Sequence, residues 1–182
     1  MKNLFVSDEI ELCPVSLKDV DDIFFTIDRE RKHLGRWLPF VEYTTARDDS
    51  LAFVKAVMVV ENGPGDIIYA IRYQGLFAGL IGYKFTDRAN RKTEIGYWIS
   101  ERYQGKGIIT RSVRAMIDQA FDQWGFHRIQ INVAVGNKRS KRIPRRLGFS
   151  LEGIARDAEL LSIGFTDIEM YALLRPDWID KQ

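Results

Sequence analysis

The spacing of apolar and polar positions changes from a helical to a strand-like period along the chain. Two early segments place apolar residues three or four positions apart, and each follows a capping-box pattern, SLKD at 16–19 and TARD at 45–48. The first pattern predicts a helix that ends near Gly35. The second predicts a helix that ends near Gly63.

The middle of the chain is rich in β-branched and aromatic residues. Three such segments, at 67–73, 76–85 and 93–100, are separated by turn residues, the first pair by Gln74-Gly75. This pattern predicts three strands joined as an antiparallel meander.

Helical spacing returns after the third of these segments. Apolar residues then recur at intervals of four, three, four and four positions, at Ile109, Val113, Met116, Ala120 and Trp124. Gly125 can close this helix, and residues 128–135 next alternate as a strand with one buried face. The order strand, glycine turn, helix, strand predicts a crossover with two parallel strands, and ligands of such sheets bind at the carboxyl ends of strands.

The carboxyl-terminal part predicts a short helix around 140–147 and two strands between Glu159 and Leu174. Pro144 lies inside the helical segment and has no N–H to donate, so we expect that helix to start late or to bend there.

The composition is that of an ordinary globular protein. The chain has 182 residues, 46% of them hydrophobic and 29% charged, so we expect one domain over 1–182. The start of the chain carries acids where a signal peptide needs an apolar run, and we expect a cytoplasmic protein. The lone Cys13 makes no internal disulfide and only two histidines are present, so we expect no metal site.

Charge is distributed unevenly. Residues 1–50 carry a net charge of −4, whereas residues 101–150 carry +8. Such a local excess of positive charge attracts anions, which include nucleic acids, acidic proteins and phosphorylated cofactors.

The sequence QGKGIIT at 104–110 lies within the basic part, at the predicted start of a helix. It does not match the nucleotide P-loop, because no glycine stands five residues before Gly105 and Gly107 follows the lysine. Two hypotheses remain for the two glycines. They relieve backbone strain in a plain turn, or they form a cradle in which helix N–H groups hold a pyrophosphate.

Two longer segments carry a family likeness. EIGYWISERYQGKGIITRSVRAMIDQAF and NVAVGNKRSKRIPRRLGFSLEG resemble the GNAT superfamily of acetyl-CoA-dependent N-acetyltransferases, in particular its RimJ/RimL-type ribosomal-protein branch with the YdaF-like members. HLGRWLPF and GFTDIEMYALL resemble the substrate-side loop and the final strands of that branch. The likeness implies an α/β fold with a mixed, mostly antiparallel twisted sheet, a splayed parallel strand pair and flanking helices.

The resemblance also implies which residues bind acetyl-CoA. The pantetheine arm would lie in the splay beside Ile99 and Ser100, and the turn at 104–110 would wrap the pyrophosphate. Lys106, Arg111 and the basic residues 138–142 would meet the remaining phosphate charge. The implied cofactor-binding residues are Ile99, Ser100, Gln104, Gly105, Lys106, Gly107, Ile108, Ile109, Thr110, Asn137 and Ser140. Ile109 departs from the superfamily pattern, which has Gly or Ala at that place, and puts cofactor affinity in question.

Three residues are implied for acyl transfer. Ser140 would donate a proton to the departing thiolate, and Glu159 would accept the proton of the amine. Glu94 is a competing base, since other branches use a glutamate on that strand. Two of them have a simpler alternative role, Ser140 as a helix cap and Glu94 as the partner of an arginine. Asn137 is a candidate cofactor contact or a residue that supports only its own turn, while Trp37 is a candidate substrate contact or a core residue.

The function is left open among three hypotheses, of which the first two are acetyl transfer to different acceptors. The first is the α-amine of a protein, including a ribosomal protein, and the second is a small amine such as a polyamine, an amino acid or an antibiotic. The third is an RNA-binding module that uses the basic residues between 138 and 146, although no aromatic residues for base stacking are interleaved there. We expect no membrane partner, and the exposed sheet edges favour a homodimer.

Overall fold

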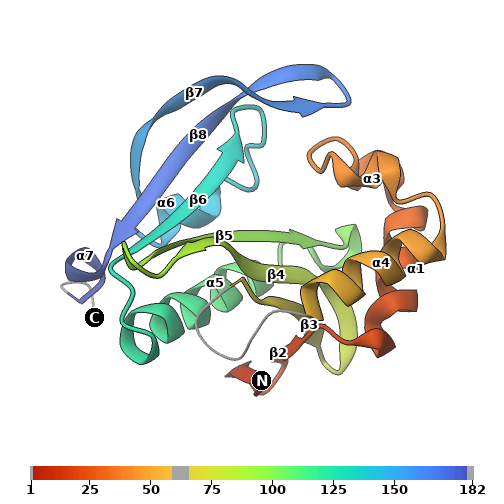
Figure 1. Ribbon diagram of the computed structural model, residues 1–182, viewed down its shortest axis with the longest axis horizontal. Coiled ribbons are helices and arrows are strands. Elements are labelled where there is room, and N and C mark those ends of the chain that lie inside the picture. Colours follow the sequence, from red (N-terminus) through yellow and green to blue (C-terminus); the bar gives the residue numbers. More distant parts are fainter. Residues whose placement is uncertain (1, 59–65, 180–182) are drawn as a thin grey trace.

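A computed structural model describes residues 2–58 and 66–179 of the chain. Within them the strands form one eight-stranded sheet in the order β1-β2-β3-β4-β5-β6-β8-β7 (Figure 1). The strands are β1 (Leu4–Ser7), β2 (Ile10–Pro14), β3 (Ile68–Tyr73), β4 (Leu76–Asp87), β5 (Lys92–Ile99), β6 (Arg128–Ala134), β7 (Ser150–Leu161) and β8 (Gly164–Leu174). Neighbours pair antiparallel except β5 and β6, which are parallel. The predicted mixed, mostly antiparallel sheet is confirmed.

Helices flank this sheet on both faces. They are α1 (Val20–Arg29), α2 (Arg31–Leu34), α3 (Phe40–Tyr43), α4 (Arg47–Met58), α5 (Ile108–Asp118), α6 (Arg142–Arg146) and α7 (Arg175–Ile179). Helix α5 packs its apolar side on one face, in a core that includes Val113, Met116 and Ile95. Helices α1 and α4 cover the other face, where Ile23 and Val54 belong to a core that includes Trp98 (Figure 1). The site lies between these two layers.

The predicted meander is confirmed as β3, β4 and β5, with the turn at Gln74-Gly75. Strands β1 and β2 were not predicted, because each is too short to show a clear alternation of apolar and polar residues. Strand β7 begins at Ser150, nine residues before the predicted start. Its residues are mostly exposed at the edge of the sheet, so no buried period marks it in the sequence.

The first predicted helix is divided into shorter elements. A single 3₁₀ turn (Leu17–Asp19) comes first, α1 ends at Arg29, and α2 ends at Leu34, directly before the expected Gly35. The predicted capping residue is confirmed, since the Asp19 carboxylate accepts a hydrogen bond from the Ser16 N–H (2.8 Å). The break at Glu30 separates α1 from α2, and its carboxylate has a role at the site described below.

The second predicted helix is confirmed as α4, but its cap differs from the expected one. Asp49, and not Asp48, accepts the N–H groups of Thr45 and Ala46, each at 2.8 Å. The capping pattern was therefore placed one residue too early. The predicted end near Gly63 lies outside the described residues.

The parallel pair β5–β6 separates after a short contact. Its register is limited to Lys92↔Arg128, Thr93↔Ile129 and Glu94↔Gln130, although β5 continues to Ile99 and β6 to Ala134. The predicted splay is thus present. Among the residues that the structure describes, main-chain groups of β5 beyond Glu94 have no strand partner on the side of β6, which leaves them available to a ligand.

Helix α6 shows the expected effect of its proline. It starts late, at Arg142, and Pro144 is its third residue, where a missing N–H costs no hydrogen bond within the helix.

Candidate active site

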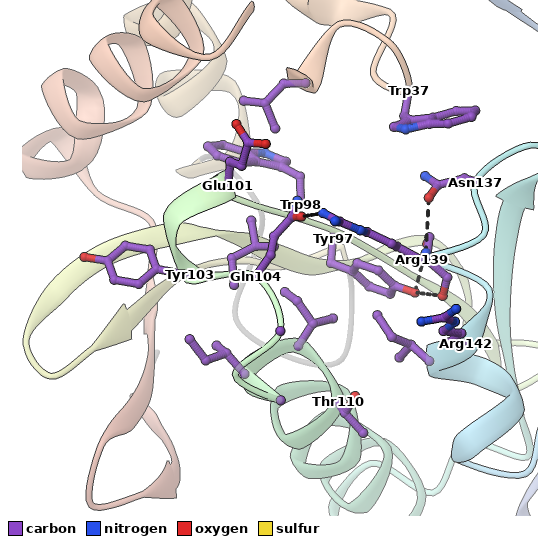
Figure 2. Close-up of a pocket in the computed structure, with 18 of the residues that line it drawn as sticks. Trp37, Tyr97, Trp98, Glu101, Tyr103, Gln104, Thr110, Asn137, Arg139 and Arg142 are labelled. Atoms are coloured by element: carbon purple, nitrogen blue, oxygen red, sulfur yellow. Dashed lines mark hydrogen bonds between the residues drawn. The ribbon is translucent and has the colours of Figure 1, made fainter. Parts of the chain in front are cut away.

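A cleft of about 690 Å³ opens at the splay of β5 and β6. Four segments form it: the chain from α2 to its following loop, the end of β5, the glycine turn with the start of α5, and residues 137–146. Its lining residues are His33, Leu34, Trp37, Leu38, Tyr97, Trp98, Ile99, Glu101, Tyr103, Gln104, Gly105, Gly107, Ile108, Ile109, Thr110, Asn137, Arg139, Ser140, Arg142, Ile143 and Arg146. Segments far apart in the sequence therefore meet here (Figure 2).

The glycine turn has the backbone shape of an anion cradle. Gly105 and Gly107 have φ of +77° and +72°, a region that other residues enter at a cost, and a Cβ at either place would meet no atom within 4 Å. Gly107 caps α5, and no side chain bonds to the first N–H groups of that helix. The open space, unpaired N–H groups and positive end of the helix dipole fit a phosphate.

Gln104 begins this turn and connects two sides of the cleft. Its amide nitrogen lies 2.6 Å from Nε2 of His33, while its carbonyl oxygen accepts a hydrogen bond from the Arg139 guanidinium (Figure 2). His33 also lies 3.7 Å from the Glu101 carboxylate. Neither His33 nor Glu101 was predicted as a site residue, because only the tertiary fold brings α2 to the end of β5.

The basic residues divide into those that line the cleft and those that do not. Arg139, Arg142 and Arg146 line it. Lys106 instead lies over the ring of Tyr73 (5.2 Å), and Arg111 lies 3.6 Å from the Glu9 carboxylate, so neither side chain lines the cleft. Positive charge beside the cradle therefore comes from the segment around α6.

Ile109 departs from the family pattern without blocking the cleft. It is 6% exposed and belongs to the core beneath α5, together with Val113 and Met116. The side chain is accommodated in the apolar core, so the main chain at this place is left free to face the cleft.

The end of β5 was predicted to flank the thioester arm. Ile99 lines the cleft, whereas Ser100 is buried and does not. The Ser100 hydroxyl donates to the Glu30 carboxylate (2.6 Å), which also accepts the Glu101 N–H (2.8 Å). Glu30 thereby caps the 3₁₀ turn Glu101–Tyr103 that leads into the glycine turn.

Ser140 lies on the opposite wall in a hydrogen-bonded turn. Its N–H donates to the Asn137 side chain (3.1 Å) and its hydroxyl donates to the Tyr97 hydroxyl (3.2 Å), which itself donates to the Ser140 carbonyl (3.3 Å) (Figure 2). Asn137 therefore supports the turn that presents Ser140. Burial raises the pKa of Tyr97 far above its ordinary value, so Tyr97 stays a neutral phenol beside Ser140.

Tyr97 was not predicted as a site residue, although its strand was. A sequence signal existed: Tyr97 alternates with Glu94, Gly96 and Trp98, so it lies on the same side of β5 as Ile95 and Ile99. Ile99 was already a predicted cofactor contact.

Trp37 forms one boundary of the cleft, near Asn137 and across from Thr110 (Figure 2). Its ring packs against the small cluster of Ala134, Leu161 and Ile168, and a Cβ added to Gly136 would lie 3.0 Å from that ring. Trp37 is thus both a packing residue and part of the cleft wall, and its role as a substrate contact stays a prediction.

The two candidate carboxylates, Glu94 and Glu159, lie outside the cleft lining, and their surroundings differ. Glu94 is buried, with its carboxylate 2.7 Å from Lys84 Nζ and accepting a hydrogen bond from Asn132 (2.8 Å). Glu159 is half-buried and forms no side-chain hydrogen bond with a described residue. Burial raises the pKa of Glu159, as does the charge of Glu94, while Lys84 partly opposes this shift.

Glu159 follows an irregular point in β7. The register of β7 on β8 shifts between Ala155 and Glu159, and Asp157 has a φ of +47° with its N–H donating to the Asp167 carboxylate (2.9 Å). A bulge of this kind redirects the side chains that follow it. The bulge therefore sets the direction of Glu159 on the edge strand.

Residues 2–58 and 66–179, which the structure describes, contain no cluster of three or more histidine, cysteine or acidic residues that would hold a metal ion. None of their helices has the length and apolar character needed to cross a membrane.

Comparison with known proteins agrees with this geometry. Residues 9–150 match the model of the acetyltransferase (GNAT) domain family. The chain is 34% identical over 177 residues to the putative ribosomal N-acetyltransferase YdaF of Bacillus subtilis (strain 168), with 95% of each chain covered. It is 29% identical over 178 residues to the ribosomal-protein-serine acetyltransferase of Escherichia coli (strain K12), with 97% of each chain covered.

A solved structure gives the same result. The structure of RimL, an alpha-N-protein acetyltransferase of ribosomal protein L7/L12 in complex with coenzyme A, superposes with a TM-score of 0.91 at 26% identity, covering 95% of this chain and 98% of that one. The splayed strands, the glycine turn and the family match together establish that this chain belongs to the GNAT family of N-acetyltransferases.

Proposed function

We propose that this protein transfers the acetyl group of acetyl-CoA to the α-amine of a protein amino terminus, with ribosomal proteins as the acceptor class. The observation that carries the proposal is the single cleft that joins the glycine cradle at 104–110 to the Ser140–Tyr97 hydroxyl pair. The acceptor class is supported by relatives named for acetylation of ribosomal proteins, which match along nearly the whole chain.

Residues along the cleft suit the successive parts of acetyl-CoA. The N–H groups at the start of α5 would hold the diphosphate, and Arg139, Arg142 and Arg146 would neutralise phosphate charge. The unpaired main chain of β5 near Tyr97 and Ile99 would bond to the pantetheine amides, as a strand bonds to a sheet edge. When bound, acetyl-CoA supplies an activated acyl group with a good leaving thiolate.

Residues of the chain would then carry out two proton transfers, one to the leaving sulfur and one from the amine. Ser140 would donate its hydroxyl proton to the leaving sulfur and regain a proton from solvent, while Tyr97, which burial keeps as a neutral phenol, would orient the Ser140 hydroxyl. Glu159 would accept the proton of the amine, directly or through a water molecule. Its carboxylate has no ion-pair partner among the described residues, whereas that of Glu94 is already bonded to Lys84 and Asn132. We therefore assign the base role to Glu159.

The energetics favour an α-amine as acceptor. An α-amine with a pKa near ~8 loses its proton more readily than a lysine near ~10.4, a difference of about 3 kcal/mol. One half-buried carboxylate is a modest base. It suits an acceptor that is already partly neutral near pH 7.

The test measures acetyl transfer with purified protein and acetyl-CoA. Candidate acceptors are peptides that copy amino termini of ribosomal proteins, the same peptides with a blocked α-amine, and spermidine. We expect free CoA to be released and the α-amine to be acetylated only with the unblocked peptides.

Two other results would contradict parts of the proposal. Transfer to spermidine but to no peptide would overturn the acceptor class. Coenzyme A binding without transfer to any amine would falsify the catalytic function itself.

A further inference from the structure

The basic residues between 139 and 146 are sorted onto two sides of one short segment. Arg139, Arg142 and Arg146 line the cleft. Lys141 and Arg145, which alternate with them, instead approach a single acidic residue on β8, Glu169. Members of each group are three or four residues apart. This spacing places the two groups on two different faces of a helical segment.

Glu169 is a buried acid whose partners are all cationic or hydroxyl groups. It is 7% exposed, and its carboxylate lies 2.8 Å from Lys141 Nζ and 3.8 Å from the Arg145 guanidinium. It also accepts a hydrogen bond from the Tyr171 hydroxyl, which in turn accepts one from Arg145 Nε (3.0 Å). Although burial opposes ionisation, these partners hold the pKa of Glu169 below its ordinary value. The carboxylate is therefore charged near neutral pH.

The segment needs such an anchor for two physical reasons. Helix α6 has five residues, and a helix of this length has no stability of its own in water. Six cationic side chains also occur within residues 138–146, and like charges on a short helix repel one another. Contact with a buried carboxylate on the adjacent sheet offsets both costs and fixes the rotation of the segment.

We propose that Glu169 is a positioning residue for the acetyl donor. By holding Lys141 and Arg145 against β8, it keeps the arginine face of residues 139–146 directed into the cleft, where the charges of Arg142 and Arg146 meet phosphate groups. This inference rests on the proposed function, since it assumes that these arginines bind the phosphates of acetyl-CoA. Glu169 itself acts only through the basic segment.

The experiment measures the affinity of coenzyme A by calorimetry for the wild type and for Glu169→Gln. Glutamine keeps the shape of the side chain but loses the charge that attracts Lys141 and Arg145. We expect Kd to rise about tenfold, within the usual range for a positioning change near a ligand. The matched control is Asp19→Asn, since Asp19 is also buried and paired with an arginine, Arg72, but lies outside the cleft.

Asp19→Asn separates positioning from general stability. We expect both substitutions to lower the melting temperature, while only Glu169→Gln weakens coenzyme A binding. Equal Kd values for Glu169→Gln and the wild type would overturn the inference, and so would the same rise in Kd in both variants. A wild type that does not bind coenzyme A would instead overturn the proposed function, so the two failures are distinguishable.

Two further variants test whether Glu169 affects coenzyme A binding through the basic segment. In an Arg142→Ala/Arg146→Ala background, Glu169→Gln should weaken coenzyme A no further, because the positioned groups are already gone. An additional full tenfold loss there would contradict the inference. Should Glu169→Gln fail to fold, Lys141→Gln removes the same ion pair from the side of its cationic partner, and the same rise in Kd is expected.

Discussion

The glycine turn and the region of the two candidate carboxylates are built in different ways. The glycine turn at 104–110 depends on main-chain groups, two glycines with positive φ and the start of one helix, all within seven consecutive residues. The carboxylate region depends on side chains from three strands, with Glu94 on β5, Lys84 on β4 and Glu159 on β7. The glycine turn can therefore be predicted from a short motif. The environment of the carboxylates cannot, because it forms only when distant strands pair in the sheet.

Glu94 and Glu159 show how the folded sheet gives two similar side chains different environments. In the sequence both are plain glutamates on predicted strands. In the fold, Glu94 is neutralised by Lys84 and bonded to Asn132, whereas Glu159 follows a bulge and has a raised pKa. A carboxylate that is poorly stabilised as an anion is the better proton acceptor. The following predictions test this contrast between the glycine turn and the carboxylate region.

The largest effect is expected at Glu159. Glu159→Gln removes the proposed proton acceptor, and kcat for a peptide amine should fall by about a hundredfold or more. Glu94→Gln should change kcat by less than about threefold while lowering the melting temperature, because Lys84 would lose its partner. Steady-state kinetics and thermal unfolding of the two variants provide the measurement. A larger loss of kcat in Glu94→Gln would reverse the assignment.

At the cradle, the expected effect is on binding rather than on the chemical step. Gly107→Val forces a β-branched residue into a left-handed conformation, at a cost of about 1–2 kcal/mol, and displaces N–H groups that face the diphosphate. We expect the Kd of coenzyme A to rise about tenfold, by the loss of roughly one or two charge-assisted hydrogen bonds.

Gly75→Val is the control for that substitution. Gly75 has a φ of +78°, its Cβ would also meet no atom within 4 Å, and it lies in the β3–β4 turn, away from the cleft. Both variants should lose similar stability in thermal unfolding, but only Gly107→Val should bind coenzyme A more weakly. Unchanged affinity in Gly107→Val would show that the turn is only structural.

The sequence predicted the central part of the fold because its signals are local. The strands from Ile68 to Ile99, the amphipathic α5 and the alternating β6 each display their period within a few residues. Strands β1 and β2 and the first half of β7 were missed, since they are short or exposed on both sides. The first helix divides at Glu30, whose carboxylate bonds to Ser100 and Glu101, about seventy residues away in the chain, so no local signal shows its role.

The same distinction applies to the site. The family motif placed Gln104, Gly107, Asn137 and Ser140 in one cleft, where the structure has them. The motif could not show that His33 approaches Gln104 or that Lys106 turns toward Tyr73, because both depend on packing between distant segments. Nor could it divide the basic residues into those that face the cleft and those that face Glu169.

The smallest effect expected is a shift in the pH dependence of the rate. Lys84 lowers the pKa of Glu159, so Lys84→Met should raise that pKa further. A base acts only when it is deprotonated, so the acidic limb of the profile of kcat/KM should move to higher pH, and the variant should lose most activity at the acid end. Lys92→Met is the control, because Lys92 lies on the neighbouring strand β5 and pairs with Asp87 (3.9 Å) instead of with Glu94. An acidic limb that stays in place in Lys84→Met, or that moves equally in both variants, would mean that the carboxylate region does not set the protonation state of the base.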